Sequence, residues 1–168
     1  NFLLLSNIFS QKEPKATEVW SPEARVVTSA ENNAPPSDAI VLFDGVNLEN
    51  EWTNEKGEKP GWIVADNCVT VKRGTGTIKT KRVFEDFQLH IEWRAPSEVK
   101  GESQGRGNSG VYMQSRYELQ VLDSFGLDGK NNECGGIYSI SEPIVNMCLP
   151  PLAWQTYDID FTAAKFDA

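Results

Sequence analysis

The stretch Tyr117-Glu-Leu-Gln-Val-Leu-Asp123 alternates apolar and polar side chains, which is typical of a half-buried β-strand. Because successive side chains of a strand point to opposite faces, Glu118 and Gln120 share one face and the apolar side chains share the other. Asp123 falls out of phase with this pair unless a bulge or the strand end re-aims it. Carboxylates and an amide near one sheet face predict a polar, oxygen-rich ligand such as a sugar. The alternative is an ordinary solvated face of a two-sided strand.

Short stretches of the same kind recur along the chain, separated by Gly, Asn and Pro residues. The longest alternation is Phe87-Gln-Leu-His-Ile-Glu-Trp-Arg94, with apolar side chains on one face and polar side chains on the other. No helical periodicity competes over a useful length. We therefore predict an all-β fold, a sandwich or jelly roll. Strands are expected at residues 39–43, 62–64, 69–71, 75–80, 87–94, 110–114, 117–122, 136–140 and 156–161.

The chain is expected to contain one jelly-roll domain, residues 39–168, after an extended lead-in at residues 11–38 that is rich in Pro, Glu, Ser and Asn. Residues 1–10 are similar to the apolar core and small-residue end of a secretory signal, which predicts a secreted or periplasmic protein. The alternative is an ordinary short apolar segment. Because the sequence stops soon after the strand at 156–161, we expect the C-terminal strands of the domain to lie beyond it.

The 168 residues carry a net charge of -8, and the pI is about 4.7. Nucleic acids and anionic membranes bind basic surfaces, so this composition argues against both as partners. No apolar stretch reaches the roughly 18 residues that a membrane-spanning helix needs. A carbohydrate substrate is the partner that the polar strand face predicts.

The 3 cysteines, Cys68, Cys134 and Cys148, have no spacing typical of a metal site. In an oxidising compartment, Cys134 and Cys148 could form a disulfide and leave Cys68 free. The alternative is a set of buried thiols. With a single histidine in the chain, a zinc site is not expected.

Several polar residues on the expected strands could share one sheet face. His90, the only histidine, is a candidate general acid or base, because its ordinary pKa lies near neutrality. No cofactor is required by the sequence, but a divalent cation held by Glu118, Asp123 and amide or backbone oxygens is conceivable. Each of these side chains could equally be a solvated strand residue. The set comprises His90, Glu92, Arg94, Tyr112, Gln114, Glu118, Gln120, Asp158 and Asp160.

Several segments, in order along the chain, carry a resemblance to a known family. They are Leu42-Phe-Asp-Gly45 with Asn47-Leu48, Phe87-Gln-Leu89, Trp93-Arg94, Asn108-Ser-Gly110, residues 117–123, Gly136-Ile-Tyr138 and Trp154-Gln-Thr-Tyr157. Together, from about Ile40 to Asp167, they resemble the 3-keto-disaccharide hydrolase domain, whose fold is a concanavalin A-like jelly-roll β-sandwich. The Glu-x-Gln-x-x-Asp strand that follows Asn-Ser-Gly is the specific part.

The resemblance implies a bacterial, exported glycosidase that acts on 3-keto sugars. The same strand is also similar to the Glu-x-Asp-x-x-Glu strand of family 16 glucanases, but Gln120 and Asp123 replace its second and third acids. That difference argues against double displacement by two carboxyl groups about 5 Å apart. A 3-keto sugar permits removal of the C2 proton, elimination of the C1 substituent and hydration of the enone.

On this hypothesis Glu118 acts as the base or as a metal ligand, Gln120 and Asn108 bind the sugar, and Asp123 orients or assists. His90 is a further catalytic candidate, and Glu92, Arg94 and Tyr138 are further substrate-binding candidates. The main rival is a non-catalytic carbohydrate-binding module on the same fold, because a fold does not determine a function. A third alternative is an adhesion or structural domain.

Overall fold

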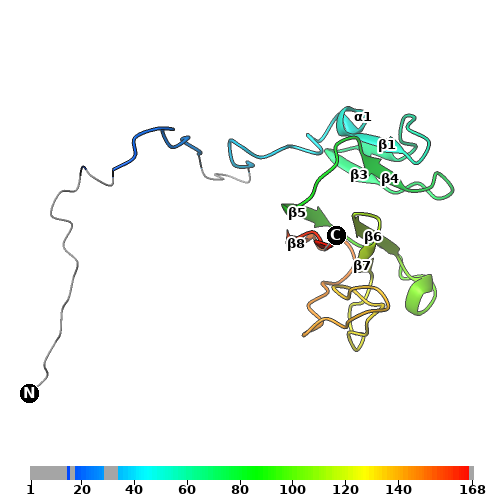
Figure 1. Ribbon diagram of the computed structural model, residues 1–168. Helices are drawn as coiled ribbons and strands as arrows, with labels where there is room; N and C mark the ends of the chain where they lie inside the picture. The colour runs from blue at the N-terminus through cyan, green and yellow to red at the C-terminus, as the bar shows by residue number, and fades with distance from the viewer. Residues whose placement is uncertain (1–14, 16–17, 29–33, 167–168) are drawn as a thin grey trace, which may run out of the picture. The chain divides into compact units, whose positions relative to one another are not determined.

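The computed structural model describes residue 15, residues 18–28 and residues 34–166 (Figure 1). They divide into two compact units, with the boundary between Lys81 and Arg82. Strands dominate both units, as the all-β prediction requires. The segment similar to a secretory signal, residues 1–10, lies outside the described residues, and the described part of the lead-in contains no strand. Within the described ranges, no helix combines the length and the apolar character needed to cross a membrane.

The first unit contains a short helix and four short strands. Helix α1 (Leu48–Glu51) leads directly into β1 (Trp52–Asn54), which pairs antiparallel with β4 (Ile78–Thr80), and β2 (Ile63–Ala65) pairs with β3 (Cys68–Thr70). Asp66 and Asn67 join β2 to β3 with φ values of 52° and 56°. Positive φ at both central residues is the signature of a tight hairpin turn whose twist matches the flanking strands.

The expected strand at 39–43 is wrong, because these residues lie outside every strand of the first unit. Ile40 and Val41 are 49% and 46% exposed, so this apolar run neither pairs nor packs in the way a strand requires. The segment instead ends in a turn, where the Asp44 carboxylate accepts hydrogen bonds from the backbone N–H groups of Val46 (2.8 Å) and Asn47 (2.7 Å). These bonds, that of Asn47 above all, lower the pKa of Asp44.

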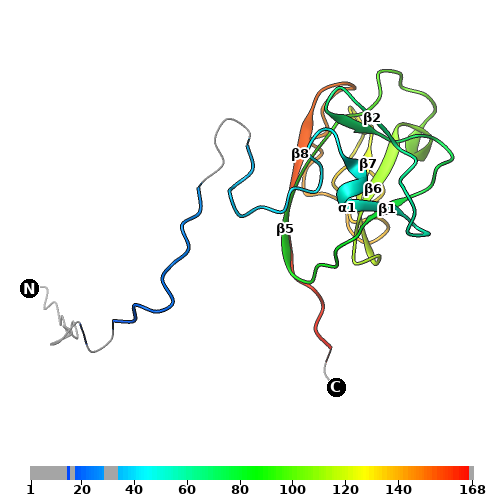
Figure 2. The same ribbon diagram turned by 90° about the horizontal axis from the view of Figure 1, so that it is seen from above.

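The second unit begins with a long antiparallel pair, β5 (Phe87–Trp93) and β8 (Gln155–Phe161), which lie side by side in Figure 2. Their apolar side chains alternate with exposed polar ones, as the period of two predicts. Aromatic contacts hold the inner face together: the rings of Phe87 and Phe161 stack with centroids 5.0 Å apart, and those of Trp93 and Tyr157 lie 5.5 Å apart.

The second pair of this unit is the hairpin of β6 (Asn108–Met113) and β7 (Tyr117–Leu122). Gln114 and Ser115, with φ values of 51° and 55°, form its turn, which the hydrogen bond from Arg116 N to Met113 O (3.1 Å) closes. The short 3-10 helix η2 (Ser103–Gly105) precedes β6.

The expected strand at 136–140 is reduced to two isolated bridges of Ile137, one with Leu119 and one with Ser141. Positive φ values at Gly135 (80°) and Ser139 (59°) interrupt an extended course. The segment nevertheless covers the free edge of β7, because Gly136 O accepts from Gln120 N and Tyr138 N donates to Glu118 O, both at 2.9 Å.

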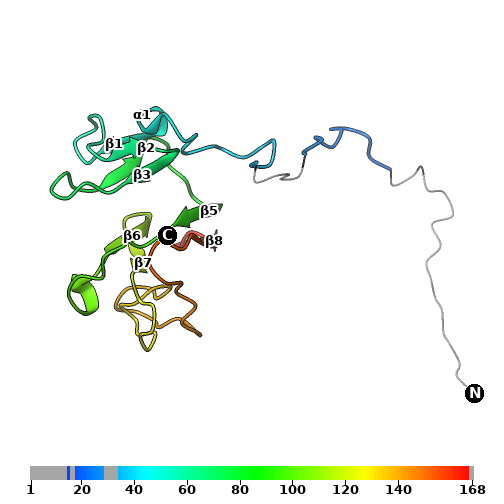
Figure 3. The same cartoon turned by 180° about the vertical axis from the view of Figure 1, so that it is seen from behind.

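The connection from β7 to β8 folds into a group of loops beside β7 (Figure 3). A hydrophobic cluster joins these loops to the strands: Cys134 and Cys148 of the loops pack with Trp93 of β5, and Val121 and Tyr157 pack against them. The Tyr157 hydroxyl donates to Gln120 O (2.7 Å) and accepts from Gly135 N (3.0 Å), which links β8 to β7 and to the loops. Burial is the main reason why the pKa of Tyr157 is raised.

Candidate active site

Glu118 and Tyr112 form a fixed carboxylate–phenol pair on the β6–β7 hairpin. They stand directly opposite each other in the register, and the Tyr112 hydroxyl donates to Glu118 Oε2 at 2.7 Å. This hydrogen bond, with a smaller contribution from burial, raises the pKa of Tyr112 to about 12. Tyr112 is 57% exposed, so one partner of the pair is open to solvent. The pair presents an oriented carboxylate at an accessible sheet surface.

Gly110 makes room for that carboxylate. A Cβ atom at this position would lie 2.7 Å from Glu118 Cγ and 2.8 Å from Cδ, and it would overlap Oε1. The Asn108-Ser-Gly110 segment lies within β6, and Gly110 has no positive φ. Glycine at this position therefore permits the close approach of the Glu118 side chain, and no unusual backbone conformation is involved.

Three side-chain amides cover the polar face of β7 next to Glu118; we call Gln104, Asn108 and Gln120 the amide cluster. Gln120 Nε2 donates to Gln104 Oε1 and to Asn108 Oδ1, each at 3.1 Å. Asn108 Nδ2 donates to Gln104 O and Oε1, again at 3.1 Å. Gln120 is only 1% exposed, so this part of the strand is not the solvated face that the alternative interpretation required.

Gln104 is a site residue that the sequence did not reveal. It lies in η2, inside a stretch that reads as an ordinary polar loop, and Ser103 before it has a φ of 47°. Its side chain joins the amide cluster to the next loop, because Gln104 Nε2 donates to Asn132 O. No periodicity marks such a residue, since its role depends on a turn that returns to β7.

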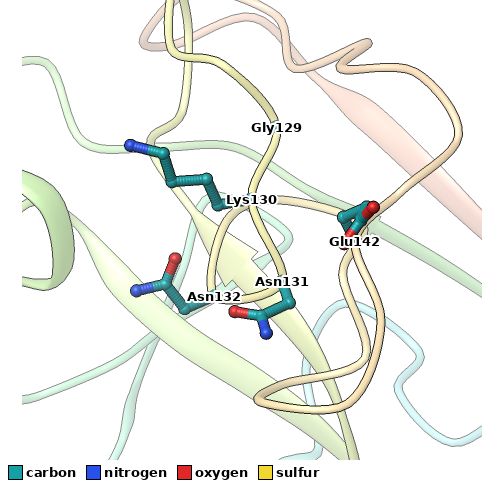
Figure 4. Close-up of a pocket in the computed structure, with 5 residues that line it drawn as sticks. All are labelled: Gly129, Lys130, Asn131, Asn132 and Glu142. Atoms are coloured by element: carbon teal, nitrogen blue, oxygen red, sulfur yellow. The ribbon is translucent and has the colours of Figure 1, made fainter.

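A polar pocket of about 540 Å³ lies on that next loop (Figure 4). Its volume falls within the usual range for small-molecule sites. Buried Glu133 shapes the loop, because its carboxylate accepts from the backbone N–H groups of Gly129 (2.6 Å) and Lys130 (3.0 Å). The lining offers an ammonium, two amides and a carboxylate, groups that can bind sugar hydroxyls. The residues that line it are Gly129, Lys130, Asn131, Asn132 and Glu142.

Asp123 is buried with 1% exposure, immediately after the end of β7. In the described part of the chain, neither of its carboxylate oxygens has a hydrogen-bond partner. Its carboxylate lies near Cys148, where it partly opposes the interactions that lower the pKa of that thiol. Continued strand alternation places it on the side of Val121 and the cysteines, opposite Gln120. Among the described residues, no hydrogen bond or ion pair joins Asp123 to Glu118.

His90, Glu92 and Arg94 belong to a different polar surface, on β5 and just after it. His90 Nδ1 lies 2.7 Å from Asp158 Oδ1, and the two side chains are 62% and 79% exposed. The Arg94 guanidinium lies 4.8 Å from the centre of the Trp154 ring. Among the residues described, no hydrogen bond or ion pair connects this surface to Glu118.

Tyr138, in contrast, lies beside the carboxylate–phenol pair. Its backbone N–H donates a hydrogen bond to Glu118 O, and an electrostatic interaction with Tyr138 is the smallest contribution to the raised pKa of Tyr112. In the described ranges, no group of at least three His, Cys, Asp or Glu side chains could hold a metal ion. A cation at Glu118 therefore stays a prediction, with no protein ligand set assigned to it.

Comparisons with known proteins agree with the fold. The model of the 3-keto-alpha-glucoside-1,2-lyase-like domain matches residues 38–168. A crystal structure from Parabacteroides distasonis, described as "a putative glycosyl hydrolase", has a TM-score of 0.83 and 42% identity, with 92% of this chain and 68% of that chain covered. This match and the strand content confirm the predicted all-β sandwich class.

A second structure from the same organism, with the same description, shows the fold alone: its TM-score is 0.56 and its identity 21%, over 73% of this chain and 63% of that chain. No protein with a curated description matches. The family model nonetheless spans most of the sequence, and it agrees with the resemblance carried by the quoted segments. The chain belongs to the 3-keto-alpha-glucoside-1,2-lyase-like domain family.

Proposed function

We propose that this protein cleaves the glycosidic bond of 3-keto sugars, with Glu118 as the base that removes the C2 proton. The observation that carries the proposal is the oriented carboxylate of Glu118, hydrogen-bonded to Tyr112 and packed against Gly110. Family membership and the described glycosyl hydrolase neighbour support a glycoside hydrolase type of function. The keto substrate and the order of steps are our own inference.

The chemistry follows from the ketone. A carbonyl at C3 acidifies the C2 hydrogen, so a carboxylate can take that proton and leave an enolate. The enolate electrons then form the C2–C1 double bond as the bond from C1 to the leaving oxygen breaks, and the leaving group departs as an alcohol after it gains a proton. Addition of water to the enone completes hydrolysis. General-base catalysis of this kind contributes about 10²–10⁴-fold to a rate.

The surrounding residues have distinct roles in this scheme. Tyr112 fixes the orientation of Glu118, and its raised pKa of about 12 keeps it protonated at neutral pH. Asn108 is exposed and can reach a sugar hydroxyl, whereas buried Gln120 acts by holding Asn108 and Gln104 in position. The polar pocket around Lys130 and Glu142 would bind the remainder of the substrate.

Turnover of paired substrates tests the proposal. A panel of 3-keto glycosides and their unoxidised parents would be incubated with the protein, with EDTA and with added divalent cations. We expect cleavage of the keto compounds alone; loss of that cleavage with EDTA would add a cation beside Glu118. Binding of both sets without cleavage of either would contradict the enzyme and favour the carbohydrate-binding module.

A further inference from the structure

We propose that Cys134 and Cys148 form an intramolecular disulfide when the protein is exposed to a disulfide oxidant such as oxidised glutathione. Both side chains are buried, at 7% and 8% exposure, in the core of the second unit. They flank the same residue: Cys134 N donates to Ser124 Oγ (2.9 Å), and Ser124 N donates to Cys148 Sγ (3.4 Å). The backbone of Cys134 and the thiol of Cys148 therefore both lie at Ser124, inside one buried cluster.

The two thiols interact directly, and they differ in acidity. The side-chain interaction with Cys134 is the main reason why the pKa of the Cys148 thiol is lowered, and the hydroxyl of Tyr157 lies 3.2 Å from Cys134 Sγ. The same interaction, with burial, raises the pKa of Cys134. Backbone N–H of Ser124 and the Gln155 side chain support the negative charge on Cys148, while burial and Asp123 oppose it. Cys148 is thus the nucleophile of the pair, because the thiolate is the reactive form.

The exchange balances in two steps. The Cys148 thiolate attacks one sulfur of oxidised glutathione, so that a mixed disulfide forms and one glutathione thiolate leaves. The charge on Cys148 is then gone, and with it the interaction that raises the pKa of Cys134. Cys134 loses its proton to solvent and attacks the Cys148 sulfur, which releases the second glutathione. The protein loses two hydrogens, and one oxidised glutathione becomes two reduced molecules.

Access determines when this reaction can occur. Because both sulfurs are buried in the folded unit, the oxidant must reach them during folding or through local opening of the 124–148 loops. Once formed, the bond closes a ring of about 15 residues and constrains the unfolded chain. It also fixes the base of the polar pocket, since Cys134 follows Glu133 directly and Glu142 lies inside the ring.

The test starts from the full chain with Cys68→Ser, which leaves only the two cysteines of interest. The protein is refolded in a glutathione redox buffer, denatured in an alkylating reagent and analysed by mass and by peptide mapping. We expect no alkylated cysteine after oxidation, a peptide pair joined through Cys134 and Cys148, and a thermal midpoint about 5–15 °C above that of the reduced protein. Reduced protein should show two alkylated sites.

Two controls keep the outcome decisive. Unsubstituted protein should form the same pair and keep Cys68 alkylatable, and Cys148→Ser should form no intramolecular bond. Two alkylatable thiols after oxidation, or crosslinks only between chains, would overturn the proposal. The peptide map of the unsubstituted protein gives this answer even where a variant fails to fold.

Discussion

Replacement of Gly110 by alanine tests whether the position of Glu118 depends on close packing against β6. The new Cβ would lie 2.7 Å from Glu118 Cγ and 2.8 Å from Cδ, well inside van der Waals contact. Because these atoms belong to the Glu118 side chain, that side chain must rotate away from β6 to relieve the overlap. Its hydrogen bond from Tyr112, 2.7 Å long, is then lost or lengthened.

The magnitude follows from two general effects. Overpacking of a core destabilises a fold by roughly 1–3 kcal/mol, and the cost here is expected at the lower end because the half-buried Glu118 side chain can move. A displacement of about 1 Å at a reacting group lowers turnover on the order of 100-fold. We therefore expect Gly110→Ala to lose about 100-fold in kcat on a 3-keto glycoside, with a modest decrease in the free energy of unfolding.

Gly105→Ala is the matched control, because a Cβ at Gly105 meets no atom within 4 Å and that residue has no positive φ. Stability would be measured by urea unfolding and activity by steady-state kinetics on both variants. If Gly110→Ala kept kcat within about twofold and the free energy of unfolding within about 0.5 kcal/mol of the unsubstituted protein while Glu118→Gln lost activity, the reasoning about the packing of Glu118 would be refuted.

Two further substitutions give three predictions with defined outcomes. Tyr112→Phe should lower kcat about 10-fold with little change in KM, since only the orientation of Glu118 is lost, and kinetics on a 3-keto glycoside would contradict this if KM alone changed. In ultraviolet titration, the same variant should lose the tyrosine that ionises near pH 12. Because folding raises the pKa of Tyr112, the protonated hydroxyl stabilises the folded protein fully below pH 10, and this stabilisation is lost between about pH 10 and 12. Gln104→Ala should destabilise the protein by about 1–3 kcal/mol in urea unfolding, because it leaves the buried amide of Gln120 with one partner fewer, and an unchanged midpoint would count against the amide cluster.

Much of the strand content was predictable from the sequence, because alternation of apolar and polar residues follows directly from the geometry of a strand. The stretches at 87–94 and 117–122 become β5 and β7 almost to the residue. The strand predicted at 39–43 was wrong for a physical reason: composition alone does not show whether a segment finds a partner strand for its backbone N–H and C=O groups. The strand predicted at 136–140 is interrupted, because the positive φ values of Gly135 and Ser139 restrict its pairing to single bridges.

The candidate site was predictable only along one strand. Alternation placed Glu118 and Gln120 on one face, and the structure keeps them there, with Gln120 covered rather than solvated. The positions of Tyr112 and Gly110 depend on the register of β6 against β7, which the sequence does not state. The position of Gln104 depends on a loop that folds back onto β7, which the sequence does not show. In the sequence, His90 and Glu118 are both polar strand residues that could act as an acid or a base. Strand pairing places His90 on the separate β5–β8 surface, beside Asp158.

The most direct test of the central claim is the kinetic isotope effect with a 3-keto glycoside deuterated at C2, measured for the unsubstituted protein, Glu118→Gln and the exposed-surface control Glu85→Gln. We predict a primary isotope effect in the unsubstituted protein and the control, and a loss of about 10²–10⁴-fold in kcat for Glu118→Gln. Full turnover by Glu118→Gln with an unchanged isotope effect would show that another group removes the C2 proton.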